Sequence, residues 1–259
     1  AWEKVQVARH ADRPHSIDYI NLIFENVIFL HGDKKFSDDN AILGCLASLS
    51  GQSVMIIGTE KGNSMDTRLK HNFGMAKPEG YRKAQRLMML ADKFNLPVIT
   101  FVDTAGAYPG IEGEERCQSE AIARNLATMS ELKTPIVVVV SGEGGSGGAL
   151  AISVGDHLCM LEYAIYSVAS PEACASIIWR EADKAPDAAK AMKVSSKELK
   201  KINIVDEIIQ EPLGGAHRDY DLISQNVKSS LIKNLSILNK LSEDELLDRR
   251  YKRILNVGA

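Results

Sequence analysis

One stretch of the sequence, residues 136–150, limits the fold more than any other. It begins with an apolar, β-branched run at 136–140, continues with five glycines between positions 142 and 148, and ends in small residues suited to a helix. This order predicts a buried strand, a loop of bare backbone and a helix that begins directly after the loop. Because glycine lacks a Cβ, a ligand can come close to its N–H group. The stretch therefore predicts a site for a negative charge, or for one that develops during a reaction.

A second glycine-rich stretch follows another predicted strand. Residues 96–102 are apolar and predict a buried strand, residues 103–110 form the glycine-containing loop, and residues 114–132 have a helical pattern. The order strand, glycine loop, helix thus occurs over 98–132 and again over 136–154. The carboxyl ends of neighbouring parallel strands meet at one crevice, which is the usual ligand position in such sheets. We therefore expect the two loops to converge.

The remaining patterns predict an α/β chain. Residues 1–16 read as a polar, basic segment, residues 17–30 as a helix capped by Ser16, residues 41–57 as a β-hairpin, and residues 58–77 as a long surface loop. Further helices are expected at 78–95, 171–179, 185–192 and 196–201, and strands at 157–161, 163–168 and 204–209. Residues 220–257 predict helices that break near Ser242, where Ser242 and Glu245 match a capping box. With no linker visible, the prediction is one domain over 1–259, with a core at about 17–210 and a helical extension at about 217–257.

Composition narrows the function classes. The formal net charge of −3 gives no global sign of nucleic-acid or membrane binding. The four cysteines form no C-x-x-C pair, which favours reduced thiols and a cytoplasmic protein, and no metal-ligand set is visible. No apolar run approaches the ~18 residues of a membrane span, and no signal peptide is found. Neither a metal nor a membrane partner is expected.

The glycine stretch allows a dinucleotide-binding interpretation. Gly142, Gly144 and Gly147 match G-x-G-x-x-G after a strand, and Glu162 lies twenty residues beyond the first of them. The motif does not require the additional Gly145 and Gly148, and the predicted helix is short. The second glycine loop also has no place in such a fold.

The same stretch allows a serine nucleophile. Ser146 lies in a G-x-S-x-G pattern between a predicted strand and helix, and Asp156, Asp183 or Asp206 followed by His217 gives the chain order of a hydrolase triad. A serine hydrolase is therefore an alternative function.

A third interpretation is an oxyanion hole without a nucleophile. The N–H groups near Gly106–Ala107 and Gly147–Gly148 would point at one carbonyl oxygen and stabilise the charge on it, a contribution of roughly 3 kcal/mol per donor in comparable sites. Close packing of a helix on a sheet is the purely structural explanation for either loop.

Several long motifs resemble one known family, the carboxyltransferase alpha subunit of bacterial-type acetyl-CoA carboxylase. The resemblance covers nearly the whole chain and is carried by residues 72–84, 103–110, 114–126, 142–151 and 211–218. One departure is Ala105, where the family usually has proline, which affects only the local turn. The family's N-terminal region has no counterpart in this sequence, which begins with Ala1 rather than methionine.

The resemblance implies a crotonase-like superhelix of repeated ββα units with a C-terminal helical extension that makes subunit contacts. It also implies a partner, a zinc-ribbon beta subunit, in an α2β2 assembly, together with biotin carboxylase and the biotin carboxyl carrier protein. The implied reaction transfers the carboxyl group of carboxybiotin, carried on that partner protein, to acetyl-CoA and gives malonyl-CoA for fatty acid biosynthesis.

The resemblance further implies roles for individual residues. The N–H groups of Gly147 and Gly148, with Gly106 and Ala107, would stabilise negative charge on the ureido oxygen of biotin, while the cofactor itself would act as the base. Gly144, Gly145, Tyr108 and Pro109 are expected to form the cofactor pocket.

The basic run around the predicted surface loop remains open to three explanations. It consists of Lys61, Arg68, Lys70, Lys77, Arg82, Lys83 and Arg86. A solvated face, CoA phosphates or an mRNA would each account for it. Within this region Arg82 is the first choice for a contact with an anionic substrate, and Phe73 is a second candidate for substrate binding.

Overall fold

The apolar, β-branched run of residues 136–140 forms the middle of an eight-stranded sheet. In the computed structural model, which describes residues 1–258, it begins β5 (Ile136–Gly145), a strand whose ten residues are all buried. The strands follow the order β1-β2-β3-β4-β5-β6-β8, and β7 pairs with the end of β5. The first two pairings are antiparallel and all the others are parallel. The predicted α/β class is confirmed.

The other strands lie close to the positions that the sequence predicts. The hairpin consists of β2 (Ile42–Leu49) and β3 (Gln52–Thr59), and it is followed by β4 (Val98–Thr104), β6 (His157–Leu161), β7 (Ile165–Ser167) and β8 (Glu207–Ile209). The chain order β4, α5, α6, β5, α7 contains the two predicted units of strand, glycine stretch and helix. Because β4 and β5 are parallel neighbours, their glycine-containing ends lie at the same edge of the sheet.

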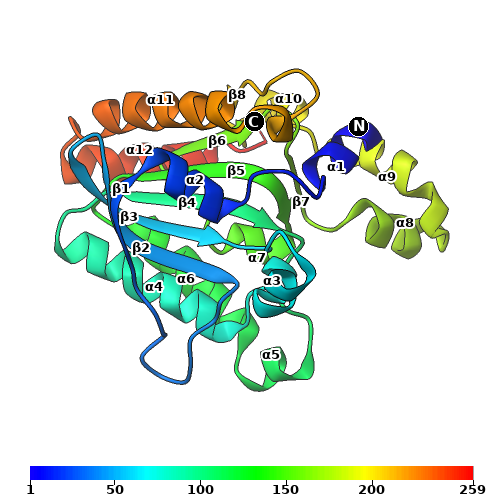
Figure 1. The fold of residues 1–259 in the computed structure, drawn as a ribbon, viewed down its shortest axis with the longest axis horizontal. Coiled ribbons are helices and arrows are strands. Elements are labelled where there is room, and N and C mark those ends of the chain that lie inside the picture. The colour runs from blue at the N-terminus through cyan, green and yellow to red at the C-terminus, as the bar shows by residue number, and fades with distance from the viewer. Residues whose placement is uncertain (259) are drawn as a thin grey trace.

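Helices cover both faces of the sheet (Figure 1). On one face α4 (Pro78–Lys93) packs on β2 and β3, and α6 (Gln118–Glu131) packs on α4 and on α12 (Glu243–Leu255). On the other face α11 (Tyr220–Leu238) packs on β5, β8 and α2 (Ser16–Ile23). Shorter helices are α3 (Met65–Lys70), α5 (Ile111–Glu115), α7 (Ser146–Leu150) and α10 (Ser196–Lys201).

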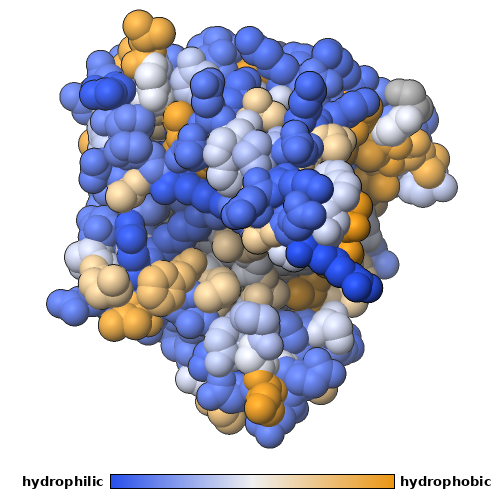
Figure 2. Space-filling view, turned by 90° about the vertical axis from the view of Figure 1, so that its right-hand side faces the viewer, coloured by the Kyte–Doolittle hydropathy of each residue, from blue (hydrophilic) through white to orange (hydrophobic). Residues whose placement is uncertain are grey.

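Three helices lie together at one end of the molecule, on the right of Figure 1. They are α1 (Trp2–Ala8), α8 (Pro171–Trp179) and α9 (Ala185–Ala191). Val5 and Ala8 of α1 share a small apolar cluster with Ile165, Ala189 and Val194, apart from the main core. Figure 2 shows this end of the molecule, where most of the surface is hydrophilic and the hydrophobic residues form separate groups. No helix of residues 1–258 is both long and apolar enough to cross a bilayer.

Several predicted boundaries are wrong for local reasons. The helix expected over 17–30 ends at Ile23, and residues Glu25–Phe29 form β1 at the edge of the sheet, because a short apolar run fits either structure and pairing with β2 decides it. The N-terminal segment contains α1, and the loop at 58–77 contains α3. The helix expected at 114–132 is divided at Cys117, whose φ of 65° breaks helical geometry.

The largest correction concerns the glycine stretch itself. Gly142, Gly144 and Gly145 belong to β5 and not to a loop. Gly144 pairs with Thr104 on one side and with Tyr166 on the other. The short strand β7, which pairs with this end of β5, holds the backbone extended through the glycines.

Candidate functional site

Two backbone segments touch where β4 and β5 end. A Cβ built on Gly148 would lie 2.4 Å from the carbonyl carbon of Gly106 and 2.5 Å from the nitrogen of Ala107. A Cβ on Gly145 would lie 2.1 Å from the carbonyl oxygen of Ala105. A side chain at either glycine would force the segments apart, so glycine is required for this contact. The expected convergence of the two glycine-containing segments is therefore present.

The N–H groups at this contact differ in availability. Gly147 and Gly148 lie in the first turn of α7, where N–H groups have no acceptor within the helix. The N–H of Ala107 has no acceptor among residues 1–258, whereas that of Gly106 donates to Thr104 Oγ1 at 3.1 Å. A Cβ on Gly147 would meet only Ile122 Cδ1, at 3.6 Å, so the space beside it is open. Three of the four predicted donor positions thus have N–H groups without an acceptor among residues 1–258.

Gly144 and Gly145 are explained by packing. The Cβ position of Gly144 lies 2.3 Å from the Tyr166 ring, and that of Gly145 is filled by Ala105. Tyr108, half-buried, donates its hydroxyl hydrogen to Glu112 at 2.8 Å, and Pro109 is exposed. A cofactor contact at these four positions stays a prediction.

A group of charged side chains lies beside the glycines, and sequence reasoning missed it. Lys61 Nζ lies 2.8 Å from Asp103 Oδ1 and 3.2 Å from Glu143 Oε2. Arg9 of the N-terminal segment reaches Glu143 Oε1 at 2.6 Å. Asp103 Oδ1 also accepts the N–H of Glu143 at 2.8 Å, so the ends of β4 and β5 are joined by a side chain as well as by the ladder.

His15 completes this group. Its Nδ1 lies 3.3 Å from Asp103 Oδ2. Burial opposes a charge on the imidazole, but the bond with Asp103 and the charge of Asp103 outweigh burial, so the pKa of His15 lies above its ordinary value. Burial likewise opposes the charge of Asp103, yet Lys61 and His15 hold the pKa of that carboxyl well below its usual range.

A pocket of about 220 Å³ opens on this charged group. Its wall is formed by the end of α1, the N-terminal cap of α2, the segment between β3 and α4, and the ends of β4 and β5. The residues are Ala8, Arg9, His10, His15, Lys61, Arg68, Phe73, Asp103, Ala105 and Glu143. Phe73, a predicted substrate contact, is therefore in the pocket wall. Asn72, Phe73 and Gly74 all have positive φ, which for two non-glycine residues in succession is a strained turn.

The structure links that strained turn to the glycine contact. Thr104 Oγ1 lies 2.6 Å from the carbonyl oxygen of Gly74 and 2.8 Å from that of Gly106. The pocket wall and the Gly106–Ala107 backbone are thus held by one buried hydroxyl.

The basic run does not form a free cationic surface. Arg82 Nε donates to Asp33 at 2.8 Å, Lys83 pairs with Asp38, and Arg86 donates to two carbonyl oxygens. Lys61 is bound as described, and Lys77 lies 3.5 Å from Glu112. The charge of Arg82 is already matched by a buried carboxylate, which weakens the prediction that it binds an anionic substrate.

The structure does not support the serine-nucleophile interpretation or the dinucleotide-binding interpretation. The Ser146 hydroxyl has no hydrogen bond within residues 1–258, although the φ of 51° at Ser146 resembles a nucleophile turn. Asp156 is bound by Arg250 at 2.8 Å, Asp206 by Arg253 at 2.6 Å, and His217 stacks on His10 at 3.9 Å. The G-x-G-x-x-G pattern lies largely in a strand, so it makes no phosphate-binding loop.

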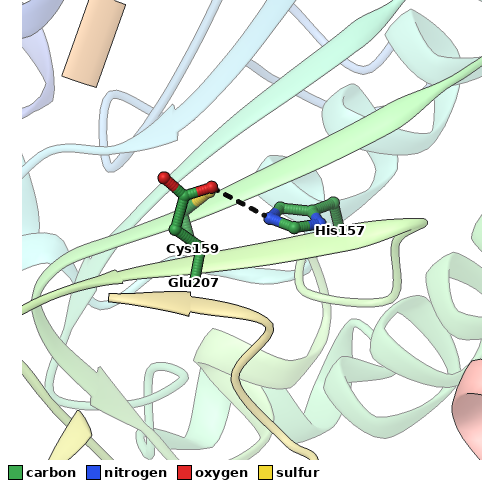
Figure 3. Close-up of side chains that lie close together, drawn as sticks. All are labelled: His157, Cys159 and Glu207. Carbon is green, nitrogen blue, oxygen red and sulfur yellow. Dashed lines mark ion pairs between the residues drawn. The ribbon is translucent and has the colours of Figure 1, made fainter. Parts of the chain in front are cut away.

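Within residues 1–258, one group of side chains has the composition of a metal site. His157, Cys159 and Glu207 place their ligand atoms within 4.8 Å of one another (Figure 3). However, Asn234 Nδ2 lies 2.9 Å from Glu207 Oε2 and 3.8 Å from Cys159 Sγ, and Lys233 Nζ lies 2.7 Å from the same carboxylate oxygen. Burial also raises the pKa of the Cys159 thiol to about 12. The Glu207 carboxylate and the Cys159 thiol therefore both have hydrogen-bond partners within the chain.

Comparison with known sequences gives a consistent result. Residues 1–258 match the family described as acetyl co-enzyme A carboxylase carboxyltransferase-like. The chain is 56% identical over 258 residues to the acetyl-coenzyme A carboxylase carboxyl transferase subunit alpha of Vibrio parahaemolyticus, covering 100% of this chain and 81% of that protein. The subunit of the same name from Histophilus somni is 57% identical, with the same coverage.

Comparison with solved structures supports the fold. Transcarboxylase 12S, solved with methylmalonyl-coenzyme A and methylmalonic acid, superposes with a TM-score of 0.72 at 19% identity, over 88% of this chain and 42% of that one. The beta subunit of Pseudomonas aeruginosa geranyl-CoA carboxylase superposes with a TM-score of 0.68 at 14% identity, over 92% and 44% of the two chains. These neighbours share the fold of this chain, which confirms the predicted fold class.

Proposed function

The chain belongs to the acetyl-CoA carboxylase carboxyltransferase family, whose alpha subunits it matches along its whole described length, and from this we propose how its residues serve carboxyl transfer. The N–H groups of Gly147, Gly148 and Ala107 act as the oxyanion donors. The N–H of Gly106 is already bound to Thr104, so Gly106 is not a donor. Its backbone instead positions the N–H of Ala107. The contact between Gly148 and Gly106–Ala107 is the observation that carries this proposal.

The residues at this contact fit the group that the family uses. Open space beside Gly147 and donors without acceptors suit a carbonyl oxygen that approaches bare backbone. Carboxybiotin, when bound, supplies the carboxyl group and a ureido oxygen that has to carry negative charge. The chain's part is to hold that oxygen with fixed N–H groups, which need no reorganisation as the charge develops. Gly144 and Gly145 hold β5 against Tyr166 and Ala105 so that these donors stay in place.

The proposal assigns the remaining chemistry to partners. The carboxybiotin is carried on a biotin carboxyl carrier protein and loaded by biotin carboxylase, and acetyl-CoA binds mainly to a zinc-ribbon beta subunit in an α2β2 assembly in the cytoplasm. Malonyl-CoA is the product. Two observations support this division of roles. The charged side chains of the pocket are largely paired with one another, and Arg82 is bound by a carboxylate of this chain, so few cations are left to bind CoA phosphates. An mRNA partner has little support, because most cations of the basic run have acceptors of their own.

Co-purification with a candidate beta subunit, followed by the reverse reaction, tests the proposal. The complex should decarboxylate malonyl-CoA only when biotin or biocytin is present. A folded complex of the two chains that shows no biotin-dependent decarboxylation would contradict the proposed function. The serine-hydrolase alternative predicts instead that the isolated chain reacts with a fluorophosphonate at Ser146.

A further inference from the structure

His15 belongs to the pocket wall, and one of its ring nitrogens is buried without a partner among residues 1–258. The side chain is only 7% exposed, and its Nε2 has no hydrogen bond within residues 1–258. The other ring nitrogen is fixed by Asp103, so the ring cannot turn to satisfy Nε2 without losing that bond. A buried polar atom without a partner is costly, which points to a ligand atom in the pocket.

A second cationic group in the wall also has spare donors. Arg68 donates Nε to the carbonyl oxygen of Gly62 at 3.3 Å, and no carboxylate of residues 1–258 pairs with it. By contrast, Lys61 is held by Asp103 and Glu143, and Arg9 by Glu143 and Glu172. The paired residues leave His10, His15 and Arg68 in the wall. Because the His10 ring stacks on His217 and its Nδ1 accepts the N–H of Asp12, His15 and Arg68 are the groups best placed to meet a charge in the pocket.

The rest of the wall is suited to the apolar part of a small ligand. Ala8, Ala105 and the partly exposed ring of Phe73 line the pocket together with the charged residues. Ala105 directly precedes the Gly106–Ala107 backbone, so this pocket adjoins the proposed oxyanion donors.

We propose that this pocket binds a carboxylate, with His15 Nε2 and the Arg68 guanidinium as its donors. The proposal rests on the proposed function, since the group to be transferred is itself a carboxylate. A guanidinium can bind a carboxylate with two parallel hydrogen bonds, and an imidazolium adds a third charged donor. Asp103, Glu60 and Lys61 are the charged groups that act on His15. Burial and the charge of Lys61 oppose its protonated form, but Asp103 and Glu60 outweigh them, and the pKa of His15 is raised.

Binding is tested first on the isolated chain with malonate as the probe. We expect malonate to shift the Nε2 resonance of His15 in a saturable manner in a nitrogen-15 spectrum of the histidine side chains. Malonamide, which has the same shape and no carboxylate, should leave that resonance unchanged. An equal response to both compounds, or no response to malonate, would overturn the proposal.

Two substitutions at His15 separate the roles of its ring nitrogens. His15→Asn retains a nitrogen near the Nδ1 position, where it can reach Asp103 and cap α2, but it removes Nε2. His15→Gln retains an amide near the Nε2 position and loses the contact with Asp103. We expect His15→Asn to weaken malonate binding about tenfold, the effect of one charged hydrogen bond, and His15→Gln to weaken it less. His31→Gln, an exposed histidine outside the pocket, is the matched control.

The two sources of the carboxylate are distinguished in the complex with the beta subunit. One arm measures kcat/KM for malonyl-CoA in the reverse reaction, and the other measures transfer from carboxylated carrier protein in the forward reaction. If His15→Asn lowers the rate in one arm only, the pocket binds the carboxylate of the compound used in that arm. If it lowers the rate in both arms, the pocket binds the carboxyl group while it is transferred between the two. Unchanged rates in both arms, with malonate binding also unchanged, refute the proposal and leave the proposed function intact. If the wild-type complex is inactive but malonate still binds at His15, the proposed function fails and the carboxylate site remains.

Discussion

At the scale of single residues, two adjacent glycines differ in the room around them. A Cβ on Gly148 would collide with the Gly106 backbone, whereas one on Gly147 would make an ordinary contact with Ile122. Both positions carry proposed donors, so stability and activity can be separated by substituting each in turn.

The first prediction uses this pair. Gly148→Ala should destabilise the fold by about 1–3 kcal/mol through overpacking and lower carboxyl transfer by about 100-fold or more. Gly147→Ala should leave stability within about 1 kcal/mol, because alanine suits a helix, yet it should still lower activity, because its methyl group lies beside the donors. Thermal unfolding and the reverse assay measure the two effects. Equal activity in wild type and Gly147→Ala would argue against donors at this position.

Ser146 provides the second prediction. Its φ of 51° is unfavourable for a residue with a Cβ, and its hydroxyl makes no hydrogen bond within residues 1–258. Ser146→Gly should therefore stabilise the chain by up to about 1 kcal/mol, as measured by urea unfolding. The wild-type chain should not be labelled by a fluorophosphonate, and Ser146→Ala should keep most of its transfer activity. Labelling that disappears in Ser146→Ala would restore the hydrolase alternative.

The sequence identified the glycines but not the side chains beside them. The glycines are a local signal, since four of the five mark places where a Cβ does not fit: Gly142, Gly144, Gly145 and Gly148. Arg9, His15, Lys61 and Asp103 are separated by up to about ninety positions, and nothing in their spacing indicates that they meet. The only local signal was the basic character of residues 9–15, which by itself is equally typical of a solvated segment.

At the scale of elements, strand β5 and helix α12 show how pairing overrides local pattern. β5 continues through Gly142–Gly145, where composition predicts a loop, because β4 and β7 supply hydrogen bonds on both sides. Helix α12 begins at the capping box of Ser242 and Glu245, as predicted, but its attachment depends on Arg250. The Arg250 side chain is 1% exposed and donates to Asp156 and to the carbonyl oxygens of Met129, Leu132 and Thr134.

The third prediction concerns this attachment. Arg250→Leu should lower the free energy of unfolding by about 3–5 kcal/mol, because it leaves the Asp156 carboxylate buried without its cation. Lys252→Leu removes an exposed ion pair on the same helix and should cost below about 1 kcal/mol. Chemical denaturation of both variants provides the comparison. Similar losses in the two would mean that Arg250 contributes no more than a surface charge.

At the scale of the whole molecule, buried ion pairs join segments that are distant in the sequence. Arg13 and Glu211 are 1% and 0% exposed and connect the N-terminal segment to the loop after β8, at 2.6 Å. Glu211 also accepts the N–H groups of Tyr163 and Ala216. With Lys61–Asp103 and Arg250–Asp156, these pairs fix the ends of the sheet and the C-terminal helix in relation to each other.

The fourth prediction concerns acid stability. The pKa of Asp103 lies below its unfolded value of about 4, so its contribution to stability is complete above that pH and is lost as the pH falls below it. Lys61→Met should raise the pKa of Asp103 and move the midpoint of acid unfolding to higher pH. Lys240→Met, at an exposed position of the C-terminal region, is the control. Circular dichroism across an acid titration gives the midpoints, and coincident midpoints for the two variants would contradict the assigned role of Lys61.

The sequence by itself determined the α/β class, most helices and strands, the two glycine segments and the family. These features depend on short-range properties: the period of apolar residues, the missing Cβ of glycine and helix capping, all of which are visible within a few residues. Only the tertiary structure decided that the glycine stretch is a strand, that the basic run is largely neutralised, and that a pocket with an unpartnered His15 nitrogen lies beside the glycines. Each of these depends on which distant residue supplies a hydrogen bond or a countercharge, and that is fixed by the packing of the sheet and its helices.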